Sequence, residues 1–117
     1  MIEAVCHCGS VRLQIAHPPA EVTECNCSIC RRYGVIWAYY SLQDVILPSP
    51  EVTETYAWDD RSIDFHRCRQ CGCVSHWFPV TRDDGRMGIN ARLLDPPILA
   101  KARLRHLDGA VTECYID

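Results

Sequence analysis

The sequence predicts a mainly β fold: one small domain of antiparallel strands, with short loops and little helix. Several short runs alternate apolar and polar side chains, as strands with one buried face do. Proline, glycine and aspartate separate these runs. The chain has 117 residues, of which 48% are hydrophobic. This length suits a single domain with its own core, so we assign residues 1–117 to one domain.

Seven segments have the strand pattern. The first follows the turn Gly9-Ser10, and two later ones follow turns that contain Gly72 and Gly85. The second segment is rich in β-branched and aromatic residues, which favour strands. The segments are residues 11–15, 35–42, 52–58, 62–66, 74–80, 86–94 and 102–107.

Little of the chain favours helix. Prolines interrupt any long helical pattern. Those that do so are Pro18, Pro19, Pro48, Pro50, Pro96 and Pro97. We therefore expect at most one short helical turn, at residues 27–34.

Charge and composition exclude several classes of protein. The net charge is −3, and eleven arginines and one lysine, Lys101, form no basic run, so we expect no binding to nucleic acid. No segment approaches the roughly 18 apolar residues that span a bilayer, so we expect no membrane association. The first ten residues lack the basic and apolar regions of a secretory signal, so we expect a cytoplasmic protein.

A reducing cytoplasm disfavours disulfides, and the chain has nine cysteines, an odd number. Metal binding is therefore the first explanation for these cysteines.

Two cysteine pairs predict one structural zinc site that pins the fold. They lie in the motif C-H-C-G at residues 6–9 and the motif C-R-Q-C-G at residues 68–72. An extended C-x-C segment puts both side chains on one face, and a tight C-x-x-C turn brings two sulfurs to one point. Together the pairs supply the four thiolates of a tetrahedral zinc site. The predicted ligands are Cys6, Cys8, Cys68 and Cys71. The alternatives are free thiols or a redox pair, although the βαβ context of a redox C-x-x-C motif is missing.

The motif C-N-C-S-I-C at residues 25–30 predicts a second zinc site, so we expect two zinc ions per chain. Its ligands are Cys25, Cys27 and Cys30. Three protein ligands with one position free is the arrangement of catalytic zinc sites. The alternatives are an iron–sulfur cluster and a fourth protein ligand that closes the site. Residues eligible as that ligand are Cys73, Cys114, His7, His17, His66, His76 and His106.

Cys73 and Cys114 belong to none of the three motifs. Free cysteine often behaves as a small buried apolar residue, and we expect this of both.

The open site favours a thiol substrate. Three thiolates around Zn²⁺ leave a net negative charge, which makes ionisation of a bound water less favourable, and coordination deprotonates a thiol. Glutathione is the natural candidate. Arg31 and Arg32 follow Cys30 directly; they could offset the negative charge or bind a glutathione carboxylate, and the alternative is a solvated basic turn.

Several aromatic residues lie on the predicted strands. Trp37 and Tyr39 share one strand face and Tyr40 takes the other, and Trp77 and Phe78 lie on opposite faces. We expect these side chains mainly to pack in the core. We assign no residue the role of acid or base.

The ordered motifs C-H-C-G, C-N-C-S-x-C and F-H-R-C-x-x-C-G resemble those of the glutathione-dependent formaldehyde-activating enzyme family, which also includes centromere protein V. The resemblance spans nearly the whole chain, with later matching segments at residues 88–90, 94–97 and 106–109. It implies a zinc-pinned, mostly antiparallel β fold. It also implies structural zinc at the first and third motifs and catalytic zinc at the middle motif.

The family's founding activity joins formaldehyde to glutathione as S-(hydroxymethyl)glutathione, and it is classed with the carbon–sulfur lyases. The resemblance therefore implies a zinc-dependent lyase that acts on a thiol adduct, with glutathione as its small-molecule partner. The alternatives are a non-catalytic, zinc-pinned module that binds a protein and a thiol or metal sensor. Many chains similar to this family have no established substrate, so the resemblance predicts the site better than the reaction.

Overall fold

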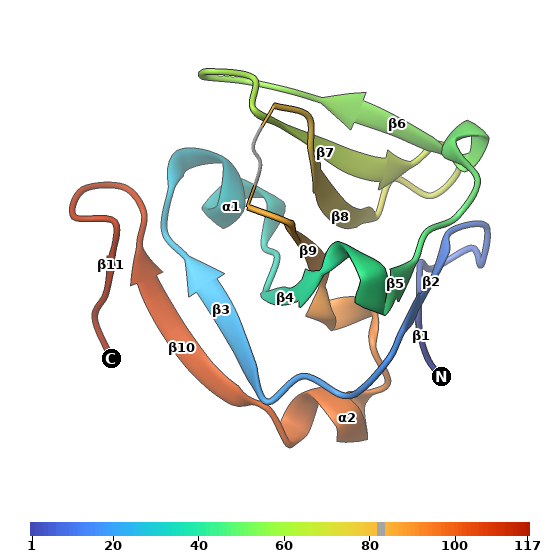
Figure 1. Ribbon diagram of the computed structural model, residues 1–117, viewed down its shortest axis with the longest axis horizontal. Helices are drawn as coiled ribbons and strands as arrows, with labels where there is room; N and C mark the ends of the chain where they lie inside the picture. The colour runs from blue at the N-terminus through green and yellow to red at the C-terminus, as the bar shows by residue number, and fades with distance from the viewer. Residues whose placement is uncertain (82–83) are drawn as a thin grey trace.

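Two β-sheets form the framework of the protein (Figure 1). The computed structural model describes residues 1–81 and 84–117. Over these residues the smaller sheet has three antiparallel strands, in the order β1 (Ile2–Val5), β2 (Arg12–Ile15) and β5 (Val45–Ile46). The mainly β fold predicted from the sequence is confirmed.

The larger sheet has eight strands over the same described residues. Their order is β11 (Cys114–Tyr115), β10 (Arg103–Asp108), β3 (Glu21–Cys25), β4 (Trp37–Ser41), β9 (Arg86–Asn90), β8 (Val74–Pro79), β7 (Ile63–Cys68) and β6 (Thr53–Tyr56). Neighbours pair antiparallel, except that β3 and β10 run parallel, with Glu21 opposite Arg103 and Cys25 opposite Leu107. Parallel pairing needs a long crossover connection, and the chain from β4 to β9 provides it.

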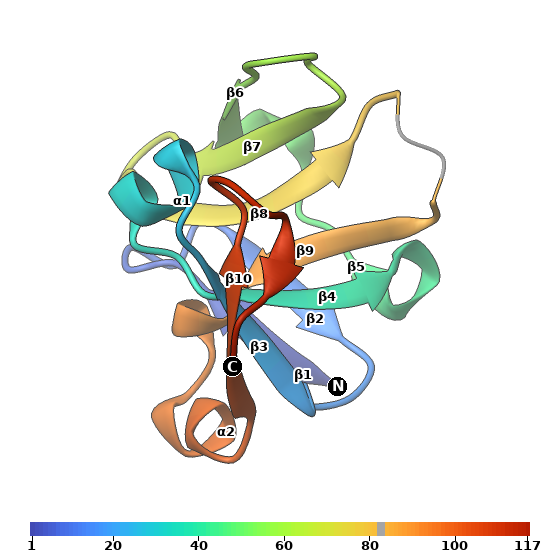
Figure 2. The ribbon, with the colours of Figure 1, turned by 90° about the vertical axis from the view of Figure 1, so that its left-hand side faces the viewer.

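Two short helices lie apart from each other: α2 (Pro96–Ala100) lies at the bottom of Figure 2, whereas α1 (Ser28–Tyr33) lies at the side, near β7 and β8. Helix α1 occupies the predicted turn and ends at Gly34, whose φ is 69°. Helix α2 was not predicted, so the limit of one helical turn was wrong. Proline in the first helical turn is favourable, because its missing N–H has no helical partner there. The prolines therefore start this helix instead of excluding it.

The strand predictions were incomplete. The sequence pattern missed β1, β3, β5 and β11, and it extended three strands into 3₁₀ turns. These turns are Leu42–Asp44, which separates β4 from β5, Pro50–Val52, which precedes β6, and Ala91–Leu93, which follows β9.

One hydrophobic core joins the two sheets. Leu13 and Ile15 of β2 pack in it with Met87 and Ile89 of β9, and all four side chains are fully buried.

No helix among the described residues is long and apolar enough to cross a membrane.

A second, aromatic cluster lies on the opposite face of the larger sheet. Trp37, Phe65 and Trp77 form it, while Ala38, the neighbour of Trp37, packs in the first core. The aromatic residues divide between faces as predicted, since Tyr39 packs against the aromatic cluster and Tyr40 in the first core. Cys25 and Cys30 belong to the aromatic cluster, so this face carries the middle cysteine motif.

A buried histidine gives the fold a pH dependence. His76 is 2% exposed, and its ring stacks on that of His66 with centroids 4.2 Å apart. Burial, followed by the nearby His66, lowers the pKa of His76 from 6.5 to about 3. Below pH 6.5 the unfolded chain therefore binds a proton at this residue that the folded chain does not bind. The stabilising contribution is complete above this pH and is lost as pH falls from 6.5 towards 3.

We expect the free energy of unfolding to depend more steeply on pH in the parent protein than in His76→Gln. Between about pH 7.5 and about pH 5.5 the parent should lose about 1.4 kcal/mol more than the variant. Urea unfolding at the two pH values measures this difference, with metal content checked at each. Equal losses in the two proteins would show that His76 titrates normally in the folded state.

Candidate metal centres

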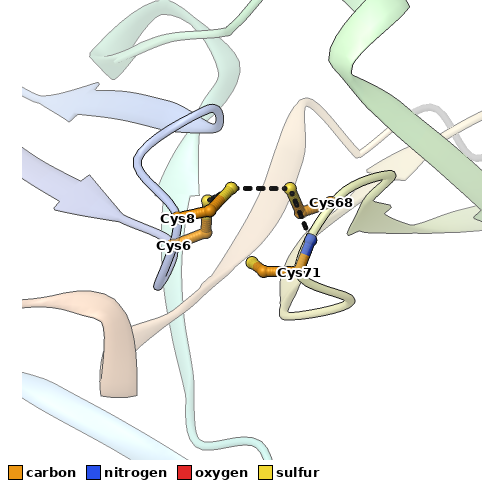
Figure 3. A group of neighbouring side chains, drawn as sticks. All are labelled: Cys6, Cys8, Cys68 and Cys71. Carbon is orange, nitrogen blue, oxygen red and sulfur yellow. Dashed lines mark hydrogen bonds between the residues drawn. The ribbon is translucent and has the colours of Figure 1, made fainter.

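Four predicted cysteine ligands meet between the two sheets (Figure 3). Cys6 and Cys8 come from the connection between β1 and β2, and Cys68 and Cys71 come from the end of β7 and the turn after it. Their four sulfur atoms all lie within 4.8 Å of one another. Cys8 Sγ is 3.7 Å from Cys6 Sγ and 3.5 Å from Cys68 Sγ. This convergence suits one tetrahedral metal ion.

Backbone conformation explains why these sulfurs converge. The glycines that follow the two pairs, Gly9 and Gly72, have φ of 86° and 80°, a region that other residues rarely enter. The tight turns also aim N–H groups at sulfur. The N–H of Val11 donates to Cys6 Sγ at 3.2 Å, and that of Gln70 donates to Cys68 Sγ at 3.4 Å. Such hydrogen bonds favour the thiolate, the form in which cysteine binds metal.

The surroundings shift the pKa values of the Cys6, Cys8 and Cys71 thiols in opposite directions. Burial raises the pKa of Cys6 to about 11, whereas the backbone N–H of Cys73 lowers the pKa of Cys71 to about 5. Hydrogen bonds with Ser10 lower the pKa of Cys8. Four neighbouring thiolates repel one another, so a positive ion among them would favour ionisation of the whole set.

The middle motif forms a second cluster beside α1. Cys25 ends β3, Cys27 is the N-cap of α1, and Cys30 lies within that helix. Their sulfur atoms also lie within 4.8 Å of one another. Over residues 1–81 and 84–117, no histidine, aspartate, glutamate or other cysteine completes this group.

Hydrogen bonds to sulfur stabilise this arrangement. The N–H of Cys30 donates to Cys27 Sγ at 3.4 Å, and Trp37 Nε1–H donates to Cys30 Sγ at 3.3 Å. The hydrogen bond with Cys30 lowers the pKa of Cys25 to about 5. The same bond and burial raise the pKa of Cys30. Cys25 and Cys30 thus share one proton, and a bound cation would displace that proton.

The turn after β10 closes against this cluster. Asn26 connects the two segments: its amide group donates to Asp108 Oδ1 at 3.0 Å, and its Oδ1 accepts from the N–H of Ala110 at 3.0 Å. Gly109 then lies so close that a Cβ at this position would be 2.5 Å from Cys25 Sγ. A side chain here would displace the thiol, so only glycine fits.

The three-cysteine cluster opens into a hollow of about 310 Å³, which we call the cysteine hollow. Its walls are largely aromatic, and Arg86 and Glu113 add charged groups. The Arg86 guanidinium lies 4.4 Å from the centre of the Tyr39 ring, a cation–π contact. Gly88 allows Trp77 to lie against β9, because a methyl group there would overlap the indole. The volume is at the lower end of the range for small-molecule sites.

Arg31 and Arg32 lie outside the cysteine hollow. Arg31 lines a separate hollow that reaches the other side of Cys25 and Cys30. Arg32 donates through Nη1 to the Ser28 carbonyl at 2.8 Å and lines a third hollow. The basic residue of the cysteine hollow is Arg86, which the sequence analysis did not identify. Strand alternation could have placed Arg86 on one face with Gly88, but no local pattern shows that β9 pairs with β4.

The two remaining cysteines differ in their surroundings. Cys73 is half-buried against the first core, in line with its predicted apolar role. Cys114 is exposed, so the expectation that it is buried was wrong. It lies in β11, a two-residue strand at the edge of the larger sheet, where little covers its side chain.

The fold and the clusters define a class of protein: a small β domain with groups of four and three cysteines that could each hold a metal ion. Residues 1–106 match the family model for the glutathione-dependent formaldehyde-activating enzyme. The chain therefore belongs to the glutathione-dependent formaldehyde-activating enzyme family, and the resemblance found from its motifs is confirmed.

A solved structure supports the same grouping. The crystal structure of a Rhodobacter sphaeroides protein matches with a TM-score of 0.72 and 28% sequence identity. The match covers 88% of this chain and 99% of that chain.

Proposed function

We propose that this protein is a zinc-dependent enzyme of the carbon–sulfur lyase type, with a thiol adduct as its substrate or product. The reaction we favour joins glutathione to formaldehyde as S-(hydroxymethyl)glutathione. The observation that carries the proposal is the three-cysteine cluster, which no fourth side chain of the described residues completes and which opens into a hollow. Family membership supports the choice of reaction.

We assign one zinc ion to each cluster. Thiolates are soft ligands that suit zinc, and the N–H groups directed at sulfur in both clusters stabilise the anionic form. The four-cysteine site would be structural and the three-cysteine site catalytic. Bound at the second site, zinc would supply positive charge that makes a substrate thiol easier to ionise. The free thiols of both clusters suit a reducing compartment such as the cytoplasm.

The proposed reaction needs few protein groups. The thiol loses its proton, its sulfur forms a bond to the carbonyl carbon, and the C=O π bond becomes a C–O single bond whose oxygen takes up a proton. The aromatic walls around Trp37 and Trp77 exclude water and hold the small aldehyde close to sulfur. Arg86 places a positive charge in the same hollow, where negative charge develops on oxygen.

This function requires a free thiol in the ligand. We expect S-methylglutathione, which keeps both carboxylates but lacks a thiol, to bind at least about tenfold more weakly than glutathione. Binding of glutathione should release a proton, so its affinity should rise with pH up to the thiol pKa of about 8.5 and then level off.

Calorimetry in two buffers of different ionisation enthalpy measures both the affinities and the proton release. Exchange of ¹³C-formaldehyde into the glutathione adduct, followed by NMR against a protein-free control, measures the reaction. Equal affinities for the two ligands with no proton released would contradict the proposed role of the thiol.

A further inference from the structure

A larger hollow adjoins the cysteine hollow. It has a volume of about 490 Å³, and we call it the arginine hollow because Arg32 and Arg67 line it. Ile29 and Trp58 line both hollows, so the two are neighbours that share a wall. A ligand that extends past Ile29 and Trp58 can occupy both hollows at once.

Helix α1 places the two hollows on different sides. Cys27 and Cys30, one turn apart, face the cysteine cluster. Ser28 and Arg32, also one turn apart, face the arginine hollow, and Ile29 lies between the two faces. The sequence motif that forms the metal cluster therefore also forms the floor of the second hollow.

The arginine hollow is suited to an anion. None of the described residues that line it is acidic. Arg67 pairs with Glu54 at 2.9 Å, but the same carboxylate also pairs with Arg69 at 3.2 Å. One negative charge is thus divided between two guanidinium groups, and the one hydrogen-bond partner of Arg32 within the described part of the chain is the neutral Ser28 carbonyl, at 2.8 Å. The net charge of these four groups is positive.

Three aromatic residues, Tyr33, Tyr56 and Trp58, also line the arginine hollow. Tyr56 and Trp58 are 49% and 40% exposed, so their rings are available to a ligand. The half-buried Tyr33 packs edge-on against Phe65, with ring centroids 5.7 Å apart, and this contact supports the inner wall. Aromatic surface beside guanidinium groups suits a ligand that carries a carboxylate next to groups that can pack on aromatic rings.

We propose that the arginine hollow binds a carboxylate of the thiol substrate through Arg32 and Arg67 while the substrate's sulfur lies in the cysteine hollow. The proposal rests on the proposed function. The two hollows share Ile29 and Trp58, so a thiol whose carboxylate lies beyond a peptide bond from the sulfur-bearing residue can extend from one hollow to the other. The arginine hollow would thus select peptide thiols over small thiols.

The test compares Arg32→Gln with Arg31→Gln in the zinc-loaded protein. Both arginines lie in the last turn of α1, so each variant loses the same favourable interaction with the helix dipole. Calorimetry gives dissociation constants for glutathione, glutathione diethyl ester and 2-mercaptoethanol. The readout is the ratio of the constants for 2-mercaptoethanol and glutathione, which general damage to the cluster would not change.

We expect Arg32→Gln to reduce this ratio about tenfold, the usual effect of losing one charged hydrogen bond. Arg31→Gln should leave it unchanged. The diester should bind the parent protein about as weakly as glutathione binds Arg32→Gln. Arg67→Gln serves as a second variant, and it should also reduce the ratio.

An unchanged ratio in both Arg32→Gln and Arg67→Gln would overturn the assignment of the arginine hollow, and so would a larger reduction in Arg31→Gln. The proposed function would stand in either case if 2-mercaptoethanol and glutathione still bound with release of a proton. Failure of the parent protein to bind either thiol would instead overturn the proposed function itself.

Discussion

Cys68→Ser should leave the protein insoluble or without fixed tertiary structure. Cys68 is 2% exposed and its sulfur lies in the four-cysteine cluster, which joins residues about sixty positions apart. Apparent binding energies of structural zinc are on the order of 10 kcal/mol. The whole stability of a domain is roughly 5–15 kcal/mol. Loss of this site should therefore remove most of the folding free energy.

Near-ultraviolet circular dichroism, thermal unfolding and zinc content measure the outcome. Cys114→Ser is the matched control, since it makes the same chemical change at an exposed thiol outside both clusters. The control should unfold at the temperature of the parent protein. A Cys68→Ser variant with unchanged unfolding and full zinc content would refute the structural role of the four-cysteine site.

The cysteine clusters could be predicted because short motifs encode them. C-x-C, C-x-x-C and the run at residues 25–30 restrict sulfur positions through local backbone geometry alone. The pairing of the first motif with the third needed only the ligand count of a tetrahedral metal. The structure brings the expected residues together in two groups that could each bind a metal ion.

Features that depend on distant strand pairing could not be predicted in the same way. The parallel pairing of β3 with β10 brings Leu107 beside Cys25 and the following Gly109 against its sulfur. Arg86 reaches the cysteine hollow only because β9 lies beside β4. No local periodicity states which strands become neighbours, so these contacts appear only in the fold.

The separation of Arg31 from Arg32 has a similar cause. Adjacent residues on a helix point about 100° apart, so the two side chains must face different surroundings. The sequence places both beside Cys30 and leaves them equivalent as carboxylate ligands. The β6–β7 hairpin brings Tyr56, Trp58 and Arg67 against α1, so a hollow forms on the side of the helix that carries Arg32. Arg31 lies outside this hollow.

The three-cysteine cluster should be needed for catalysis but, unlike the four-cysteine cluster, not for folding. We expect Cys27→Ser to fold, to retain the structural zinc, to lose about one metal ion per chain and to lose catalysis. Cys27 is the N-cap of α1, where its sulfur accepts the N–H of Cys30 at 3.4 Å. Serine is among the most favourable N-cap residues, so its hydroxyl should preserve the helix. The hydroxyl is a far weaker zinc ligand than a thiolate, because zinc sites use the deprotonated sulfur.

Native mass spectrometry counts the metal ions, thermal unfolding reports the fold, and NMR exchange of ¹³C-formaldehyde with glutathione reports the reaction. The variant should unfold close to the temperature of the parent protein, while its exchange rate should fall to that of the protein-free control. Cys114→Ser again supplies the comparison for a cysteine outside both clusters and should retain two metal ions and full exchange. If Cys27→Ser lost its structure as completely as Cys68→Ser, both clusters would be needed for folding and the division into a structural and a catalytic site would be wrong. If it retained full exchange after losing the metal, the reaction would not depend on the three-cysteine site.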